Sequence, residues 1–241
     1  MDIFLIRHGQ SANNSLGDIR NREVDPPLTD LGQQQANILA QHLATGLTHD
    51  VIISPIMGTS NLQMREGYGI TYLYCSPMYR SLQTARPVAQ ALGLAPELWI
   101  EIHERGGMYL NHGEPEGFVG YPGRTSSEIA GEFPEYKLTP GITDQGWWTG
   151  GFEDAAGCAA RAMRVASDLL ARVHTEDRVA VITHGNFMDV VLKALLNQLP
   201  SDHIYYRHHN TAITRISISA GNPVDIRSLN RVDHLPADLV S

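Results

Sequence analysis

The stretch Ile3 to Asn14 reads IFLIRHGQSANN, and it decides the fold prediction for this 241-residue chain. Its first four residues, Ile3 to Ile6, form the short apolar run that is typical of a buried strand. The run ends directly in Arg7, His8 and Gly9. We therefore expect a histidine and an arginine at the carboxyl end of the first strand.

A second apolar run has the same ending. The residues from Val179 to Thr183 predict a strand that ends in His184 and Gly185, before an amphipathic helix. Ligands of open α/β sheets bind at the carboxyl ends of the strands, so His8 and His184 are expected at one site. The helix after Gly185 would direct its free N–H groups and its positive dipole end at an anion there.

The rest of the chain alternates between strand and helix patterns. Further strands are predicted at 51–53, 70–74 and 212–218, and helices at 36–43, 162–173 and 187–195. This alternation predicts an α/β fold, a three-layer α/β/α sandwich with a central, mostly parallel sheet. We expect one domain over residues 1–241, with an irregular tail after Gly221.

A third segment supplies a second arginine to the predicted site. In Ser76-Pro77-Met78-Tyr79-Arg80, Ser76 is a suitable helix N-cap and Pro77 suits the first helical position. Arg80 would then lie in the first helical turn. The planar forks of Arg7 and Arg80 could bind phosphoryl oxygens with a geometry that lysine lacks.

The composition is that of an ordinary globular protein, with 42% hydrophobic and 18% charged residues. The net charge of −8 disfavours a nucleic-acid partner or a membrane surface. No apolar run approaches the roughly 18 residues of a membrane span, and no charged leader precedes the first strand, so we expect a cytoplasmic protein. The two cysteines, Cys75 and Cys158, lack metal-ligand spacing and are expected to be inert thiols.

Two segments interrupt the alternation. The region 106–148 is rich in Gly, Pro and aromatic residues and is expected to face the substrate, with a short helix near 126–133. The region of about 55–69 is expected to be an inserted, exposed arm that serves as a lid or a subunit contact. The sequence has two Ser-Pro pairs, and only Ser76-Pro77 is followed by an arginine at the needed offset.

Five motifs in order cover most of the chain: RHGQSANN at 7–14, LTDLG at 28–32, SPMYRSLQTA at 76–85, HERGG at 103–107 and THGN at 183–186. With these motifs the sequence resembles the histidine phosphatase superfamily, also called phosphoglycerate mutase-like, and its phosphatase branch in particular. The resemblance implies a phosphomonoester hydrolase that forms a phosphohistidine and uses no metal or other cofactor. It also implies a small phosphorylated metabolite as substrate, and the sequence is compatible with a homo-oligomer.

The resemblance also assigns roles to residues. His8 is the expected nucleophile, and Glu104 is expected to protonate the leaving oxygen. The expected phosphate-binding residues are Arg7, Asn14, Arg80, His184 and Gly185. The residue chemistry agrees, because a neutral imidazole is nucleophilic near neutral pH and a carboxyl group can act first as an acid and then as a base.

Several alternatives stay open at the level of sequence. A phosphoglycerate mutase would use the same His8, although Asn21-Arg22-Glu23 replaces the small-residue turn expected in that branch. An inactive binding or scaffold protein is a further alternative. Arg105 and Arg124 are as compatible with a surface or structural role as with substrate contact. Three histidines fit a polar loop better than a metal site: His203, His208 and His209. Five aromatic residues fit either a pocket wall or the core: Tyr109, Phe118, Tyr121, Trp147 and Trp148.

Overall fold

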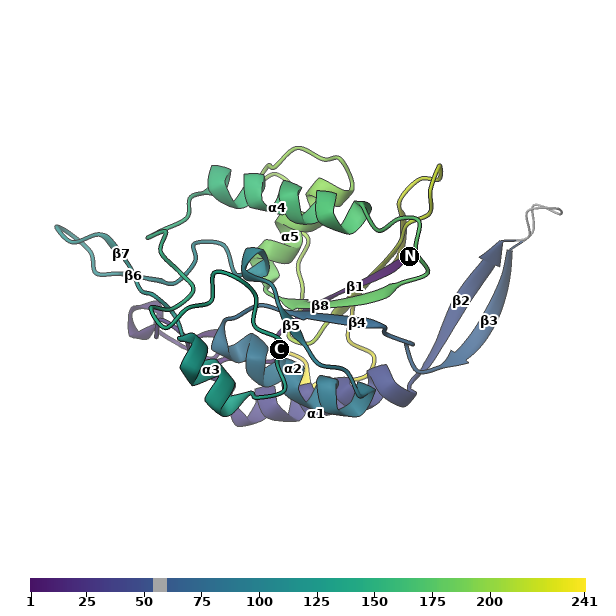
Figure 1. Cartoon of the computed structure of the whole chain (residues 1–241), viewed down its shortest axis with the longest axis horizontal. Helices are drawn as coiled ribbons and strands as arrows, with labels where there is room; N and C mark the ends of the chain where they lie inside the picture. The colour runs from purple at the N-terminus through teal and green to yellow at the C-terminus, as the bar shows by residue number, and fades with distance from the viewer. Residues whose placement is uncertain (54–59) are drawn as a thin grey trace.

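The computed structural model describes residues 1–53 and 60–241 (Figure 1). Its central sheet has six strands in the order β10-β9-β1-β8-β4-β5. Their bounds are Asp225–Arg231 (β10), Ile213–Ser217 (β9), Asp2–Arg7 (β1), Arg178–Thr183 (β8), Tyr72–Cys75 (β4) and Glu97–Leu98 (β5). Strands β1, β8, β4 and β5 are parallel, and β9 is antiparallel to both of its neighbours. The mostly parallel sheet is thus confirmed.

Helices cover both faces of this sheet (Figure 1). One layer contains α1 (Asp30–Thr45), α2 (Tyr79–Leu92) and α3 (Ser126–Glu132), and the other contains α4 (Ala155–Leu170) and α5 (Gly185–Leu195). Successive side chains of a strand point to opposite faces, so β1 contributes Phe4 and Ile6 to one core and Ile3 and Leu5 to the other. This arrangement confirms the three-layer sandwich.

Two hairpins lie outside the central sheet. Strand β2 (Leu47–Ile53) pairs with β3 (Ser60–Glu66), and β6 (Tyr109–Asn111) pairs with β7 (Phe118–Gly120). The strand predicted at 51–53 therefore exists but belongs to a hairpin. The turn Ser54-Pro55 and the first part of the predicted arm, residues 55–59, lie outside the described residues, and the arm as a unit stays a prediction.

The β2–β3 hairpin lies at the end of the sheet where β1 begins (Figure 1). In the middle of β2, Asp50 forms ion pairs with Arg178 of β8 and Arg215 of β9, and both arginines also pair with Asp2 at the start of β1. Since β1 and β8 end on the opposite side, the described strands of this hairpin are far from the predicted site. Their position does not support a lid.

The start of α2 differs from the sequence prediction. The N-cap is Met78 and the helix begins at Tyr79, so the prediction of Ser76 as N-cap and Pro77 as first helical residue is wrong. Asp25 accepts the hydrogen bond from the Tyr79 N–H at 2.8 Å, and the Ser76 hydroxyl lies 2.8 Å from Nε2 of His184. Tertiary contacts thus replace the local cap.

The prediction of an irregular tail after Gly221 is also wrong, because this segment contains β10. This strand is polar and half exposed, and two register shifts interrupt its pairing with β9, so it has no clear strand pattern in the sequence. Val173 likewise lies beyond the end of α4. The short 3₁₀ helices η1 to η4 span Ala12–Asn14, Ile19–Asn21, Ile100–Ile102 and Ala237–Leu239.

Both cysteines are buried and free, Cys75 in β4 and Cys158 in α4. Burial raises the pKa of the Cys158 thiol to about 12 and that of Cys75 well above its ordinary value. Neither thiol is therefore a reactive thiolate at neutral pH. Among the helices of the described residues, none is long and apolar enough to cross a membrane.

Candidate active site

A cavity of about 320 Å³ is lined by residues that follow β1, by the start of α2 and by the start of α5. Six of the predicted site residues line it: Arg7, His8, Asn14, Arg80, Glu104 and Gly185. The lining also includes Ser11, Asn13, Arg22, Arg105, Tyr109, Asn186, Tyr205, Arg207 and His208. Tertiary folding thus brings together residues that are up to 201 positions apart, Arg7 and His208.

His8 is held as a neutral imidazole whose Nε2 carries no proton. Its Nδ1 lies 2.6 Å from the carbonyl oxygen of Gly9, so Nδ1 carries the proton, and Nε2 accepts a hydrogen bond from Nε of Arg80 at 3.1 Å. Burial, followed by the positive charges of Arg80 and Arg7, holds the pKa of His8 well below its ordinary value of 6.5. Nε2 is therefore the unprotonated ring nitrogen at neutral pH.

Arg80 is held by a carboxylate that the sequence analysis did not identify. Asp25 caps the first turn of α2, and its Oδ1 lies 3.9 Å from Nη1 of Arg80. Burial raises the pKa of Asp25, while the nearby charge of Arg80 acts in the opposite direction. The contact spans 55 positions, and no spacing in the sequence could have predicted it.

Arg7 lies against the start of α5. Its Nη1 donates to the backbone oxygen of His208 at 2.8 Å, and its buried Nε has no partner among the described residues. A Cβ atom at Gly185 would lie 3.2 Å from that Nε, closer than most real Cβ contacts. Glycine at this position therefore lets the guanidinium reach the N-terminus of α5.

His184 is fully buried and does not line the cavity. Its Nε2 lies 2.8 Å from the Ser76 hydroxyl and 3.3 Å from that of Ser81, and its ring centroid is 5.0 Å from that of His8. Burial and the charge of Arg80 hold its pKa well below 6.5. Its Nδ1 has no partner in the part of the chain that the structure describes. Phosphate binding by His184 stays a prediction.

Glu104 lies across the N-terminus of α5. Its Oε1 accepts from the backbone N–H of Phe187 at 3.0 Å and from that of Arg105 at 2.8 Å. The nearby Glu101 is paired with Arg164 instead. Among the glutamates of this region, Glu104 is thus the one whose carboxyl group faces the cavity.

Asn14 and Asn210 lie between the backbone of His8 and the residue Ser241. Nδ2 of Asn210 donates to the backbone oxygen of His8 at 2.9 Å and lies 3.3 Å from Oδ1 of Asn14. The backbone N–H of Asn210 donates to the carbonyl of Ser241 at 2.9 Å. The C-terminal residues therefore order the backbone around His8.

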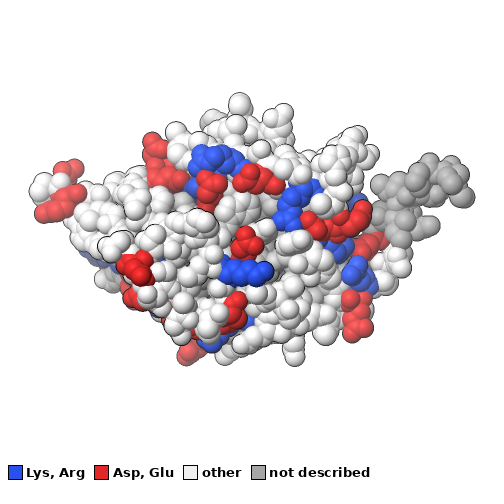
Figure 2. Space-filling model, viewed as in Figure 1, with Lys and Arg blue, Asp and Glu red and all other residues white. Residues whose placement is uncertain are grey.

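The cavity is strongly basic although the chain is acidic. Its lining contains five arginines and one carboxylate, Glu104. On the face of the molecule shown in Figure 2, by contrast, basic and acidic residues are interspersed. Such a local excess of positive charge favours an anionic ligand. Arg22 and Arg207 were not predicted as site residues, because neither lies in a motif.

Some of the residues whose role the sequence left undecided line the cavity, and others lie elsewhere. Arg105 lines the cavity, whereas Arg124 pairs with Glu132 and lies over the ring of Tyr79. Tyr109 lines the cavity, and Trp147 is buried in the core. His208 lines the cavity and contacts Thr214, and the described residues include no group of His, Cys, Asp and Glu arranged to hold a metal ion.

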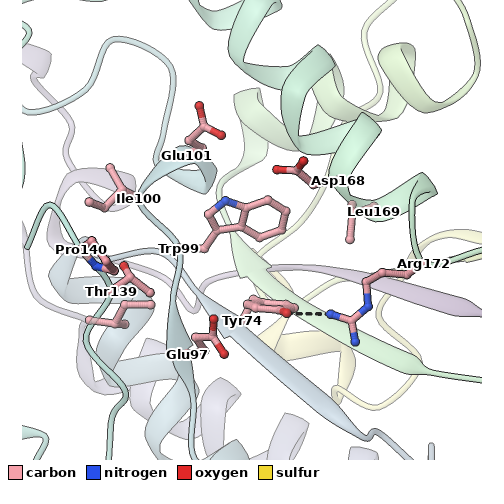
Figure 3. Close-up of a pocket in the computed structure, with 11 residues that line it drawn as sticks. Tyr74, Glu97, Trp99, Ile100, Glu101, Thr139, Pro140, Asp168, Leu169 and Arg172 are labelled. Carbon is pink, nitrogen blue, oxygen red and sulfur yellow. Dashed lines mark hydrogen bonds between the residues drawn. The ribbon is translucent and has the colours of Figure 1, made fainter. Parts of the chain in front are cut away.

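A separate cavity of about 540 Å³ lies at the β5 edge of the sheet (Figure 3). Trp99 and Tyr74 form part of its wall, and Nη1 of Arg172 donates to the Tyr74 hydroxyl at 2.7 Å. None of the predicted site residues lines it. Its lining contains three carboxylates, Glu97, Glu101 and Asp168, and one arginine, which disfavours a phosphate ester, so the candidate site is the smaller, basic cavity.

Acidification should lower the melting temperature by several degrees between about pH 7.5 and about pH 5.5. Burial lowers the pKa values of His103, His208 and His234 to about 4 each, from 6.5. Between pH 6.5 and about pH 4 the unfolded chain therefore binds protons that the folded chain does not bind. The contribution of these histidines to the free energy of unfolding is complete above pH 6.5 and is lost as the pH falls towards 4. The melting temperature of the wild-type protein should fall as the pH is lowered, and that of His234→Gln should fall less steeply. A melting temperature that does not change with pH would contradict the lowered pKa values of these histidines.

Comparison with known proteins supports the family assignment. The family described as histidine phosphatase superfamily (branch 1) matches residues 3–60 and 61–231. A probable phosphoglycerate mutase GpmB from Yersinia enterocolitica is 24% identical over 218 residues, which cover 90% of this chain and 84% of that protein.

Solved structures are similar over nearly the whole chain. A phosphoserine phosphatase from Entamoeba histolytica, in complex with phosphoserine, has a TM-score of 0.59 and 22% identity, covering 98% of this chain and 99% of that chain. A mycobacterial glucosyl-3-phosphoglycerate phosphatase in complex with VO3 has a TM-score of 0.57 and 17% identity, covering 96% and 99%. These structures share the fold. Because the family match extends over most of the sequence, the chain belongs to the histidine phosphatase superfamily, branch 1.

Proposed function

We propose that this protein is a phosphomonoester hydrolase that acts on a small phosphorylated metabolite through a phosphohistidine at His8. One observation carries the proposal: a neutral histidine presents the lone pair of Nε2 inside a cavity lined by five arginines and a glutamate. The first test is turnover of p-nitrophenyl phosphate by the purified protein. An inactive binding protein of this fold would give none.

The first chemical step transfers the phosphoryl group to the protein. Nε2 of His8 attacks phosphorus, the bond from phosphorus to the ester oxygen breaks, and the carboxyl group of Glu104 protonates the leaving alkoxide. The hydrogen bond from Nδ1 to the Gly9 carbonyl, 2.6 Å long, stabilises the positive charge that the imidazole acquires. Arg7 and Arg80 neutralise charge on the transferring oxygens.

The second step regenerates the enzyme. The Glu104 carboxylate takes a proton from water, the water oxygen attacks phosphorus, and the phosphorus–nitrogen bond breaks to release inorganic phosphate. Asn14, His184 and the N-terminus of α5 at Gly185 complete the proposed phosphate-binding set. This scheme needs no metal and no cofactor, since side chains and the helix terminus supply the charge stabilisation.

A phosphoglycerate mutase is the second candidate, and the relative named as a probable GpmB favours it. A mutase must retain the dephosphorylated intermediate and exclude water until the phosphoryl group returns. Here the segment from Gly106 to Tyr121 contains no arginine and forms the β6–β7 hairpin, whose second strand is exposed along its length. Water should therefore outcompete phosphoryl return.

With 3-phosphoglycerate and catalytic 2,3-bisphosphoglycerate, the protein should form little 2-phosphoglycerate while it hydrolyses other phosphomonoesters to free phosphate. Coupled assays of 2-phosphoglycerate and of phosphate give the ratio directly. Mutase turnover faster than hydrolysis of every ester tested would replace the hydrolase proposal with an isomerase.

Activity should survive EDTA, and vanadate should inhibit. Vanadate adopts the five-coordinate geometry of in-line displacement, which the arginines and His8 are placed to stabilise. The mycobacterial structure of the same fold was solved with VO3. Assays of p-nitrophenyl phosphate hydrolysis with chelator, and with chelator followed by divalent ions, provide the check. Loss and metal-dependent recovery would contradict the scheme.

A further inference from the structure

We propose that the substrate alcohol carries an aromatic ring, which binds in a second cavity that adjoins the basic one. The inference rests on the proposed function and specifies its substrate class. The second cavity, of about 400 Å³, is lined by the β6–β7 hairpin and by the segment around η2. It shares two residues with the basic cavity, Arg22 and Tyr109. A ligand with its phosphoryl group at His8 can therefore extend past Tyr109 into this space.

Two aromatic rings form part of the wall of this cavity. Tyr109 and Phe118 line it, and Phe152 packs behind them, with ring centroids 5.6 Å apart for Tyr109 and Phe118 and 4.3 Å apart for the stacked Phe118 and Phe152. Phe118 is nevertheless 51% exposed and Phe152 41% exposed. An exposed cluster of rings beside a ligand cavity is typical of a surface that binds an apolar partner.

The ring of Tyr109 is fixed from behind. A Cβ atom at Gly106 would lie only 2.3 Å from Cε1 of Tyr109, so the backbone packs directly against the ring. A ring that is already immobilised loses little conformational entropy when a ligand stacks on it. The wall is therefore preorganised for a flat ligand group.

Three polar side chains of the cavity each have a hydrogen-bonding group that is already engaged within the protein. Oδ1 of Asn111 accepts from the backbone N–H of Gly113 at 3.0 Å, Nε2 of His112 lies 3.0 Å from the Tyr121 hydroxyl, and Arg20 pairs with Asp18. A sugar or polyol would need such groups to hydrogen-bond its hydroxyls. Their engagement favours an aromatic group over a polyhydroxylated one.

Arg22 is the remaining charged group of this wall. Its Cζ lies 5.9 Å from the Tyr109 ring centroid, and no carboxylate of the described residues lies within ion-pairing distance of it. A guanidinium that is not paired can stack on an aromatic ring. The cavity thus offers two aromatic faces and one cationic face to a ligand ring.

Binding of two phosphonates tests the inference without turnover. 2-Phenylethylphosphonate and ethylphosphonate have the same anionic head and no leaving group, so a difference in affinity reports the ring alone. Calorimetry on wild-type protein should give roughly ten-fold tighter binding of the phenyl compound. Phe118→Ala should reduce this preference to about three-fold or less, and Phe118→Tyr should retain it.

Met163→Ala is the matched control, because Met163 is an exposed apolar residue of α4 that lines neither cavity. Its preference should equal that of wild type. Retained binding of ethylphosphonate by Phe118→Ala shows that this variant is folded. Equal affinity of wild type for both phosphonates, or a preference that Phe118→Ala leaves intact, would overturn the inference.

The outcomes separate the two proposals. Hydrolysis of p-nitrophenyl phosphate without any phosphonate preference would remove the aromatic subsite and leave the hydrolase. A phosphonate preference that depends on Phe118, in a protein that hydrolyses no phosphomonoester, would leave the subsite and remove the hydrolase.

Discussion

His8→Ala should lower kcat for p-nitrophenyl phosphate by about 10⁴-fold or more, the scale seen when a covalent catalytic apparatus is disabled. The physical reason is that Nε2 of His8 is the unprotonated nitrogen that lies beside Arg80 in the cavity. The arginines are charged, His184 lies outside the lining, and the imidazole of His208 contacts the Thr214 hydroxyl. Water alone would then have to attack the substrate.

The intermediate provides a second readout for the same variant. Wild-type protein mixed with a labelled phosphomonoester and quenched in alkali should retain acid-labile phosphate, and His8→Ala should retain none. His174→Ala is a suitable control, because His174 is exposed and remote in sequence from every motif. Turnover by His8→Ala at the wild-type rate would refute the covalent mechanism.

Arg80→Ala should lower kcat by about 10²- to 10³-fold, which corresponds to about 2.7–4 kcal/mol for the loss of one oriented transition-state donor. Nε of Arg80 donates to Nε2 of His8 at 3.1 Å, while Nη2 lies 3.2 Å from Sδ of Met78 and Nη1 lies 3.9 Å from Oδ1 of Asp25. The guanidinium is thus placed beside the bond that forms. The substitution also removes one of the positive charges that lower the pKa of His8.

Two further variants show whether the loss of activity in Arg80→Ala comes from the position of the charge or from the shape of the guanidinium, and melting temperatures report the stability. Arg86→Ala removes an arginine of the same helix that pairs with Glu135 outside the cavity, so its kcat should be close to that of wild type. Arg80→Lys should recover only part of the activity, because lysine lacks the planar fork. Melting temperatures check whether the loss of the Asp25 contact unfolds the protein. Equal rates for Arg80→Ala and Arg86→Ala would show that Arg80 is not at the site.

Local patterns in the sequence were sufficient for the parts of the molecule that are decided locally. The apolar run before Arg7 and His8 is a central strand, and the helical spacing after Gly185 is α5. Turn and strand predictions failed where distant residues compete for the same groups. Ser76 is the example: its hydroxyl contacts His184, 108 positions away, and Asp25 caps α2 in its place.

The amino-acid sequence by itself determined the alternation of strands and helices in the central sandwich, the family, and the residues that follow the ends of β1 and β8. Hydrophobic periodicity indicates the strands and helices, and short motifs with a chemical function indicate the family and the residues at the strand ends. The tertiary structure alone decided that Asp25 supports Arg80, that His184 lies behind the cavity wall, and that Arg22 and Tyr109 join two cavities. Such contacts depend on packing between segments far apart in the chain, for which a single sequence contains no periodic signal.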